Sequence, residues 1–155
     1  MRYWLFKSEP ETFGIKHLQK KPKQTEHWDG VRNFQARNML RDEIKVGDKA
    51  FFYHSNCIPP GIVGTVEIVK NGYPDLSCLN PESKYYDPVS TKENPRWYMV
   101  DVRFEKEFKH MITLDQLKNN PALENMVVTR RGNRLSITPV TAQEWKIILA
   151  MEKKS

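Results

Sequence analysis

Four segments of this sequence have the character of β-strands, and they limit the folds that the chain can adopt. The predicted strands are residues 2–8, 49–55, 61–70 and 97–108. Side chains alternate between the two faces of a strand, and the first segment places Trp4 and Phe6 on one face and Tyr3 and Leu5 on the other. The last segment alternates over twelve residues in the same way. The sequence therefore predicts a β-sheet.

Short helices and loops connect these strands. A helix is predicted within 12–20, weakened by Gly14, and another over 30–41 with Asp29 as its N-cap. The strands 49–55 and 61–70 are joined by a hairpin-like loop, whose prolines are unsuited to a central strand. Short strand-like stretches occur at 126–128 and 135–137.

Two sequence patterns of the capping-box type mark helix starts near the C-terminus. Thr113 and Gln116 form the first, with Ile112 and Leu117 as its hydrophobic staple. Residues 141–144 repeat the pattern and open a helix that extends to about residue 152. Together the elements predict an α+β domain with mixed or antiparallel strands in a small barrel, decorated by short helices.

Composition narrows the class of protein. The 155 residues suit one domain, 1–155, and 39% hydrophobic with 28% charged residues favours a folded chain. No apolar run approaches the roughly 18 residues of a membrane span, and we expect no signal peptide or membrane partner. The chain has two cysteines, a low number that is typical of proteins in a reducing intracellular compartment. The net charge of +6 allows a nucleic-acid partner without requiring one.

Residues 71–96 lack periodicity and contain four of the ten prolines. Loops of this length inside a compact domain are uncommon and tend to be functional. A surface excursion without a role is an equal alternative.

Catalytic and metal-binding patterns are weak. Ser55 follows His54 directly, and neighbours on a strand point to opposite faces, so the histidine is badly placed to activate the hydroxyl. His54 and Cys57 form a single pair without a second pair at ligand spacing. The sequence therefore predicts a protein that is not an enzyme and has no metal or other cofactor.

Aromatic residues outside the apolar segments indicate a pocket for a planar ligand. Trp28 precedes the predicted helix, Trp97 follows the proline-rich segment, and Tyr85 and Tyr86 lie within it. Each ring alone suits the core better than a site, but together with a helix that carries Asn33 and several arginines they favour ligand binding.

Several blocks of the sequence resemble the EVE domain family. The blocks are Tyr3–Pro10, Trp28–Asn38, Phe51–Ser55, Pro60–Gly64, Tyr86–Pro88 and Arg134–Val140. They follow the family order over nearly the whole chain. The resemblance implies a PUA-like fold, a small β-barrel with peripheral helices, related to the YTH domains that bind methylated adenine in RNA. It also implies that the chain binds a modified, methylated or hydroxymethylated, base of DNA or RNA.

The resemblance also assigns roles to residues. An extruded base would stack against Trp28 and Trp97, with Tyr53 as a further ring. The polar groups expected around the base are Lys7, Ser8, Asn33, His54 and Ser55. The groups expected to contact phosphates are the free N–H groups of Gly30 and Val31 and the side chains of Arg32, Arg37, Arg41, Arg130, Arg131 and Arg134.

Other interpretations stay open. Arg37 and Arg41 equally suit a solvated surface, and Arg32 a buried anchor paired with Glu9 or Asp87. A metal-independent ribonuclease of the related ASCH type, using Lys7, Tyr53 and His54, is the enzyme alternative. A binder of free nucleosides is the small-molecule alternative. We expect a cytoplasmic location, or a nuclear one in a eukaryote.

Overall fold

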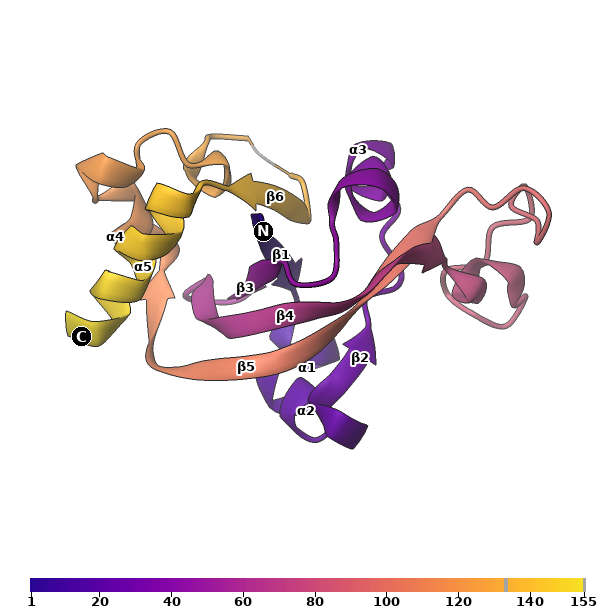
Figure 1. The fold of residues 1–155 in the computed structure, drawn as a ribbon, viewed down its shortest axis with the longest axis horizontal. Helices are drawn as coiled ribbons and strands as arrows, with labels where there is room; N and C mark the ends of the chain where they lie inside the picture. The colour runs from indigo at the N-terminus through magenta and orange to yellow at the C-terminus, as the bar shows by residue number, and fades with distance from the viewer. Residues whose placement is uncertain (133, 155) are drawn as a thin grey trace.

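The computed structural model describes residues 1–132 and 134–154, which fold around a mixed sheet of six strands (Figure 1). The strands are β1 (Tyr3–Ser8), β2 (Thr25–His27), β3 (Lys49–His54), β4 (Gly61–Pro74), β5 (Tyr98–Thr113) and β6 (Ile137–Val140). Their order in the sheet is β2-β5-β4-β3-β1-β6. The pair β1–β3 is parallel, and the other neighbours are antiparallel.

Short helices join and cover the strands. The α-helices are α1 (Pro10–Phe13), α2 (Ile15–Gln19), α3 (Phe34–Asn38), α4 (Leu114–Lys118) and α5 (Ala142–Lys154). The remaining turns are the 3₁₀-helices η1 (Pro22–Gln24), η3 (Leu76–Leu79), η4 (Pro121–Leu123) and η5 (Val127–Thr129) and the π-helix η2 (Met39–Glu43). The predicted α+β class with peripheral short helices is confirmed.

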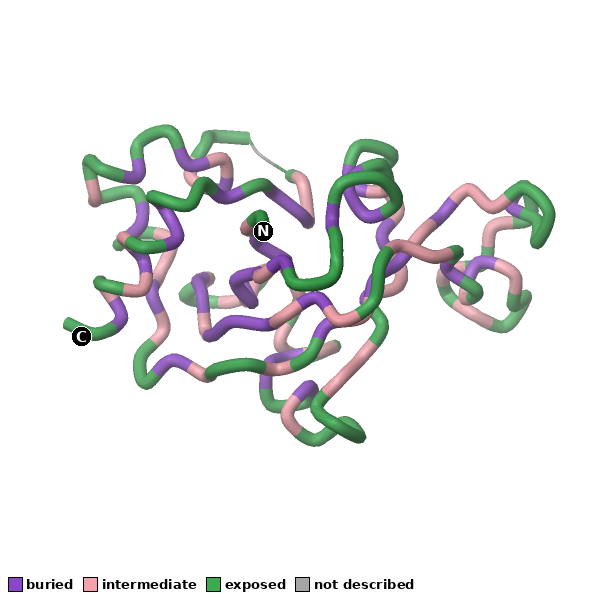
Figure 2. Tube along the Cα trace, viewed as in Figure 1, coloured by how far each residue is buried: buried purple, intermediate pink, exposed green. Residues whose placement is uncertain are grey.

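Both faces of the sheet are buried, as the alternation in the first strand predicts. Trp4 and Phe6 belong to a core cluster that also includes side chains of α2, α3 and η2. Leu5 belongs to a second cluster, to which α4 and α5 contribute, and Tyr3 packs against it. Figure 2 shows the resulting concentration of buried positions along the central strands. The sheet therefore separates two hydrophobic cores.

The four predicted strands are confirmed, and two are longer than predicted. β4 continues to Pro74 and β5 to Thr113. Both capping boxes are present: Thr113 and Gln116 bond reciprocally, and so do Thr141 and Glu144. The hairpin between β3 and β4 is also as predicted.

Three local predictions are wrong. The stretch 126–128 is not a strand, because Val127–Thr129 forms a 3₁₀ turn. The helix predicted within 12–20 is two helices separated at Gly14, which is extended. The helix predicted over 30–41 begins only at Phe34, because its N-cap is Asn33, whose Oδ1 accepts the Ala36 N–H at 3.0 Å, and not Asp29.

The segment between β4 and β5 projects from one end of the sheet (Figure 1). Its base is closed by the Asp75 N–H, which donates to the Trp97 carbonyl at 2.9 Å. Within it, the Asp87 N–H donates to the Cys78 carbonyl at 2.9 Å. The excursion thus has a defined structure, and residues 84–85 return to the body of the protein, where they line a cavity. Across the described ranges, no helix has the length and apolar character to cross a membrane.

Candidate functional site

A cavity of about 360 Å³ opens where β1 and β2 end. Its walls come from five parts of the chain: the end of β1, helix α1, the segment from β2 to residue 32, the excursion at 84–85, and residue 136. The lining residues are Lys7, Ser8, Glu9, Thr12, Phe13, Glu26, His27, Trp28, Asp29, Gly30, Val31, Arg32, Lys84, Tyr85 and Ser136. The structure thus brings six of the predicted site residues, Lys7, Ser8, Trp28, Gly30, Val31 and Arg32, to one place.

Three aromatic rings reach this cavity, those of Phe13, Trp28 and Tyr85. Trp28 is anchored in the core, since its ring lies 5.4 Å from that of Phe6 and 5.5 Å, edge to face, from that of Phe52. Its backbone N–H donates to the Val100 carbonyl at 2.7 Å, next to the end of β2. A ring held in this way offers a fixed surface for a planar ligand.

Gly30 lets Tyr85 approach the backbone. Gly30 has a φ of +77°, and a Cβ added there would lie 2.7 Å from the ring carbons Cε1 and Cε2 of Tyr85. Real Cβ atoms essentially never approach other atoms so closely. A glycine is therefore required both by the left-handed backbone and by the ring above it.

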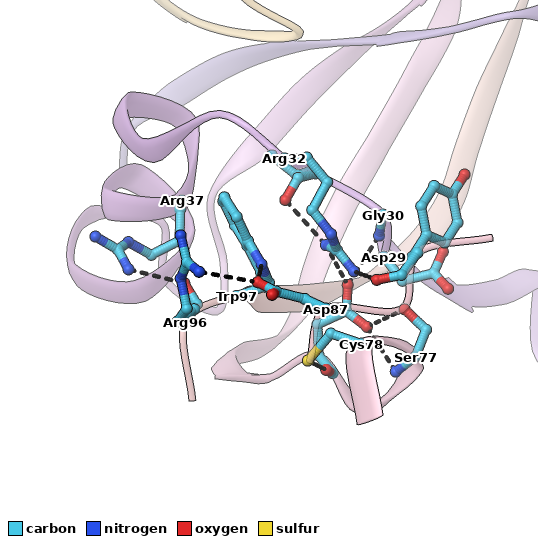
Figure 3. Close-up of polar contacts among 12 residues, drawn as sticks. Asp29, Gly30, Arg32, Arg37, Ser77, Cys78, Asp87, Arg96 and Trp97 are labelled. Carbon is cyan, nitrogen blue, oxygen red and sulfur yellow. Dashed lines mark hydrogen bonds and ion pairs between the residues drawn. The ribbon is translucent and has the colours of Figure 1, made fainter. Parts of the chain in front are cut away.

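Arg32 ties the excursion to the cavity wall (Figure 3). Its Nη1 donates to Asp75 Oδ2 and to the Val31 carbonyl, both at 3.1 Å, and its Nη2 donates to the Tyr85 carbonyl at 2.8 Å. The guanidinium carbon also lies 5.3 Å from the Tyr85 ring centre and 5.1 Å from that of Trp97. Arg32 is thus a structural anchor whose carboxylate is Asp75, and the predicted pairing with Glu9 or Asp87 is wrong.

Asp75 accepts most of the hydrogen bonds that join the excursion to the segment around Arg32, and its side chain is fully buried. Besides Arg32, it accepts the Gly30 N–H at 2.8 Å and both the N–H and hydroxyl of Ser77. Burial would raise the pKa of this carboxyl, but the hydrogen bonds from Ser77, Gly30 and Arg32 outweigh burial and hold its pKa below the ordinary value. The Gly30 N–H, expected to be free for a phosphate, is therefore already used.

Trp97 lies outside the cavity lining. Its indole N–H donates to Asp87 Oδ2 at 2.6 Å, and its ring stacks on Phe34 at 4.9 Å. It is 6% exposed, and its ring centre lies 5.1 Å from the Arg32 guanidinium carbon. Tyr85, not Trp97, is therefore the second large aromatic side chain of the cavity.

Lys7 and Asp29 are two half-buried charged groups of the cavity. Burial lowers the pKa of Lys7, and its Nζ lies 5.9 Å from the Tyr53 ring centre. Burial, and after it the nearby Asp75 carboxylate, raises the pKa of Asp29. Asp29 Oδ2 lies 3.9 Å from His27 Nε2, a distant ion pair, and the carboxylate also accepts a hydrogen bond from the backbone of Asp29. Lys7 thus supplies a hydrogen-bond donor, and Asp29 an acceptor, to the lining of the cavity.

Four other residues expected beside the base do not line this cavity. Asn33 is the N-cap of α3. Tyr53 is buried in the second core cluster, and burial raises its pKa to about 12. His54 Nε2 accepts the Ile15 N–H at 3.2 Å, and burial lowers the pKa of this histidine. Ser55 lines a neighbouring cavity.

The expected phosphate-binding residues separate into two groups. Arg37 donates to the Arg96 carbonyl at 2.7 Å, and Arg41 pairs with its neighbour Asp42 at 2.8 Å. In contrast, the exposed Arg130 and Arg131 line a third cavity of about 420 Å³. Arg134 lines the same cavity as Ser55. Val31 is buried in the first core cluster and also lines the first cavity, the one that Trp28 and Tyr85 reach.

Two residues organise this site: sequence reasoning missed Asp75, and it named Tyr85 among the loop aromatic residues without placing it beside the base. Tyr85 had a signal, since it is an aromatic residue within an aperiodic segment, but nothing local indicated which ring would fold back. Asp75 joins partners 43 and 45 residues away, and no spacing rule connects them. Within the described part of the chain, no three His, Cys, Asp or Glu side chains gather as a metal site.

Comparisons with known proteins give consistent matches. A family model described as EVE domain matches residues 2–151. Thymocyte nuclear protein 1 of Homo sapiens is 46% identical over 169 residues, which cover 98% of this chain and 74% of that protein.

Solved structures match over the same extent. The crystal structure of the human protein in complex with DNA containing 5-methylcytosine superposes with a TM-score of 0.93 at 45% identity, covering 100% of this chain and 99% of that one. A crystal structure from Pseudomonas putida gives 0.92 at 43% identity, covering 97% and 99%. These matches confirm the fold class expected from the resemblance.

Proposed function

Because the chain belongs to the EVE domain family, we propose that it is a non-catalytic DNA-binding protein that recognises a methylated cytosine. In this proposal the modified base leaves the DNA stack and enters the first cavity, the one lined by Trp28 and Tyr85, between these two rings. The observation that carries the proposal is the position of Trp28. It is a core-anchored indole at a cavity, in a chain that superposes over its full length on a protein solved with 5-methylcytosine DNA.

The polar groups of the cavity suit the edge of cytosine. Cytosine presents an exocyclic amine, a hydrogen-bond donor for which aspartate and glutamate are suitable acceptors. Asp29 offers such an acceptor, and Lys7 offers a donor for the ring nitrogen or carbonyl oxygen. Thymine presents a carbonyl in place of the amine and would face the Asp29 carboxylate oxygen unfavourably.

The energies set the size of the expected effects. Stacking of one base on an aromatic side chain contributes about 1–3 kcal/mol, or roughly 5- to 150-fold in affinity. Burial of one methyl group contributes about 0.8 kcal/mol, or roughly fourfold. We therefore expect strong dependence on Trp28 and a moderate preference for the methylated base.

The test is binding of short DNA duplexes that carry one cytosine or one 5-methylcytosine, with the matching RNA as comparison. The variant Trp28→Leu removes the ring while keeping an apolar side chain in the core. Trp145→Leu is the matched control, because Trp145 is equally buried in the second core cluster, away from the cavity. We expect Trp28→Leu to weaken binding of methylated DNA at least fivefold and to abolish the methyl preference. Trp145→Leu should leave both unchanged.

Equal binding of methylated and unmethylated DNA by the wild type would contradict the proposal. Equal losses in the two variants would show that only stability had been measured. A preference for RNA over DNA would replace the proposed ligand.

The environment of His54 supports the non-catalytic part of the proposal. A ribonuclease mechanism needs a histidine free to transfer a proton. Here Nε2 accepts a backbone hydrogen bond from Ile15, and burial lowers the pKa of the ring. Cleavage of RNA in the presence of EDTA that is lost in His54→Ala would contradict this part of the proposal.

A further inference from the structure

A second cavity of about 370 Å³ adjoins the first and differs from it in character. It is lined by Lys7, Ser8, Glu9, Ser55, Asn56, Arg134 and Ser136. Every one of these side chains is polar or charged, whereas the first cavity contains three aromatic rings. Lys7, Ser8, Glu9 and Ser136 line both cavities, so the two are neighbours that share one wall.

The wall between the cavities is held by backbone hydrogen bonds. The Lys7 N–H donates to the Ser136 carbonyl at 2.8 Å, and the Ser55 N–H donates to the Ser8 carbonyl at 3.0 Å. Because β1 and β3 run parallel, with Ser8 opposite His54, both strands end at this point. The second cavity is therefore built at a fixed junction of three chain segments.

The charges of this cavity are unbalanced. Lys7 and Arg134 are cations, and Glu9 is its one carboxylate. Glu9 Oε1 accepts a hydrogen bond from Asn56 Nδ2 at 3.3 Å. Among the residues that the structure describes, neither cation forms an ion pair with a carboxylate. A half-buried ammonium without a counter-charge is unfavourable, so a bound anion would relieve this cost.

We propose that the second cavity binds the phosphate group of the nucleotide whose base occupies the first cavity. The inference rests on the proposed function, which places the base beside Trp28. Lys7 then contacts both parts of the nucleotide, and Arg134 contacts the phosphate alone. The hydroxyl of Ser55 and the side-chain amide of Asn56 provide neutral donors in the lining of the same cavity. The recognised unit is thus a nucleotide with its phosphate, rather than a base.

The experiment compares three ligands by calorimetry: 5-methyl-2′-deoxycytidine and its 5′- and 3′-monophosphates. We expect one of the monophosphates to bind at least tenfold more tightly than the nucleoside, since it adds charge-assisted hydrogen bonds. Arg134→Gln should remove most of that gain and leave binding of the nucleoside unchanged. Arg103→Gln is the matched control, because this exposed arginine pairs with Glu67 on the sheet and lines none of the three cavities.

The outcomes separate this inference from the proposed function. Nucleoside binding without a gain from either phosphate would overturn the second site and leave the base site standing. A gain that survives Arg134→Gln, or that is lost equally in Arg103→Gln, would also overturn it. Failure of the wild type to bind any of the three ligands would instead contradict the proposed function itself.

Discussion

Gly30 shows how a single missing side chain shapes the cavity. The left-handed φ of +77° places its N–H toward Asp75 and its Cα beneath the ring of Tyr85. Any other residue would be strained at this φ and would collide with the ring. The position of Tyr85 thus depends on a residue 55 positions earlier in the chain.

We predict that Gly30→Ala displaces Tyr85 and weakens binding of methylated DNA about tenfold or more, within the range of one lost stack. Unfolding free energy should fall by about 1–2 kcal/mol because of the left-handed strain. Gly132→Ala is the control, since Gly132 also has a positive φ, +76°, but nothing lies within 4 Å of an added Cβ. A similar loss of binding in both variants would contradict the role of the close contact.

The half-buried Lys7, again a single residue, predicts that nucleotide binding depends on pH. Burial lowers its pKa below the ordinary value of 10.5, so the ammonium loses its proton at a lower pH than an exposed lysine. The charged form binds the phosphate, and affinity for 5-methyl-dCMP should therefore fall as the pH rises through the lowered pKa. Tyr53, the ring beside Lys7, has a pKa of about 12 and stays neutral in this range.

Titration of nucleotide affinity from pH 7.5 upward measures this effect, because the phosphate, with a second pKa of about 6, is already almost fully in its doubly charged form there. Lys7→Arg should bind with little change over the same range, because a guanidinium stays protonated. A decline of the same size in this variant would assign the titration to another group.

At the scale of elements, the excursion between β4 and β5 and the segment from β2 to α3 depend on each other. Asp75 and Arg32 hold them together, and neither segment has regular structure of its own at the contact. A buried carboxylate with several charge-assisted hydrogen bonds contributes much more than an exposed ion pair. The stability of the cavity wall therefore depends on the contact between Asp75 and Arg32.

We predict that Asp75→Asn lowers the unfolding free energy at pH 7 by about 2–3 kcal/mol, because Arg32 loses its charged partner. The folded-state pKa of Asp75 is depressed, so its contribution is present above the unfolded-state pKa and is lost as the pH falls through the folded value, below 3.8. The difference between wild type and variant in urea unfolding should therefore shrink in strong acid. Asp42→Asn, in an exposed pair with Arg41, should leave stability unchanged. A constant difference at all pH values would contradict the assignment.

The sequence predicted those elements whose cause is local. Alternation placed Trp4 and Leu5 in different cores, and both capping boxes start helices where they should. The start predicted for the helix over 30–41 was wrong because Gly30 is left-handed and gives its N–H to Asp75, a contact that local patterns do not contain. Trp97, and not Tyr85, was predicted to lie beside the base for the same reason, because long-range hydrogen bonds decide which ring lines the cavity.

At the scale of the molecule, one segment connects all three cavities. Residues 127–136 contribute Arg130 and Arg131 to the third cavity, Arg134 to the second and Ser136 to both the first and the second. The chain has a net charge of +6, and three of its cations, Arg130, Arg131 and Arg134, belong to this segment and line the second and third cavities. A DNA strand that delivers a base to Trp28 would follow this segment, so its arginines should bind backbone phosphates without reading sequence.

The double variant Arg130→Gln/Arg131→Gln tests this arrangement. Each phosphate contact contributes about 0.9 to the slope of log affinity against log salt on duplex DNA, so the slope should fall by up to about 1.8. Because the contacts carry no base information, affinity should drop equally for methylated and unmethylated duplexes, and the roughly fourfold methyl preference should persist. Arg103→Gln is the control: Arg103 pairs with Glu67 on the sheet, lines none of the three cavities and should not alter the slope. An equal change of slope in the control would mean that binding follows net charge, whereas loss of the methyl preference in the double variant would place these arginines in base recognition.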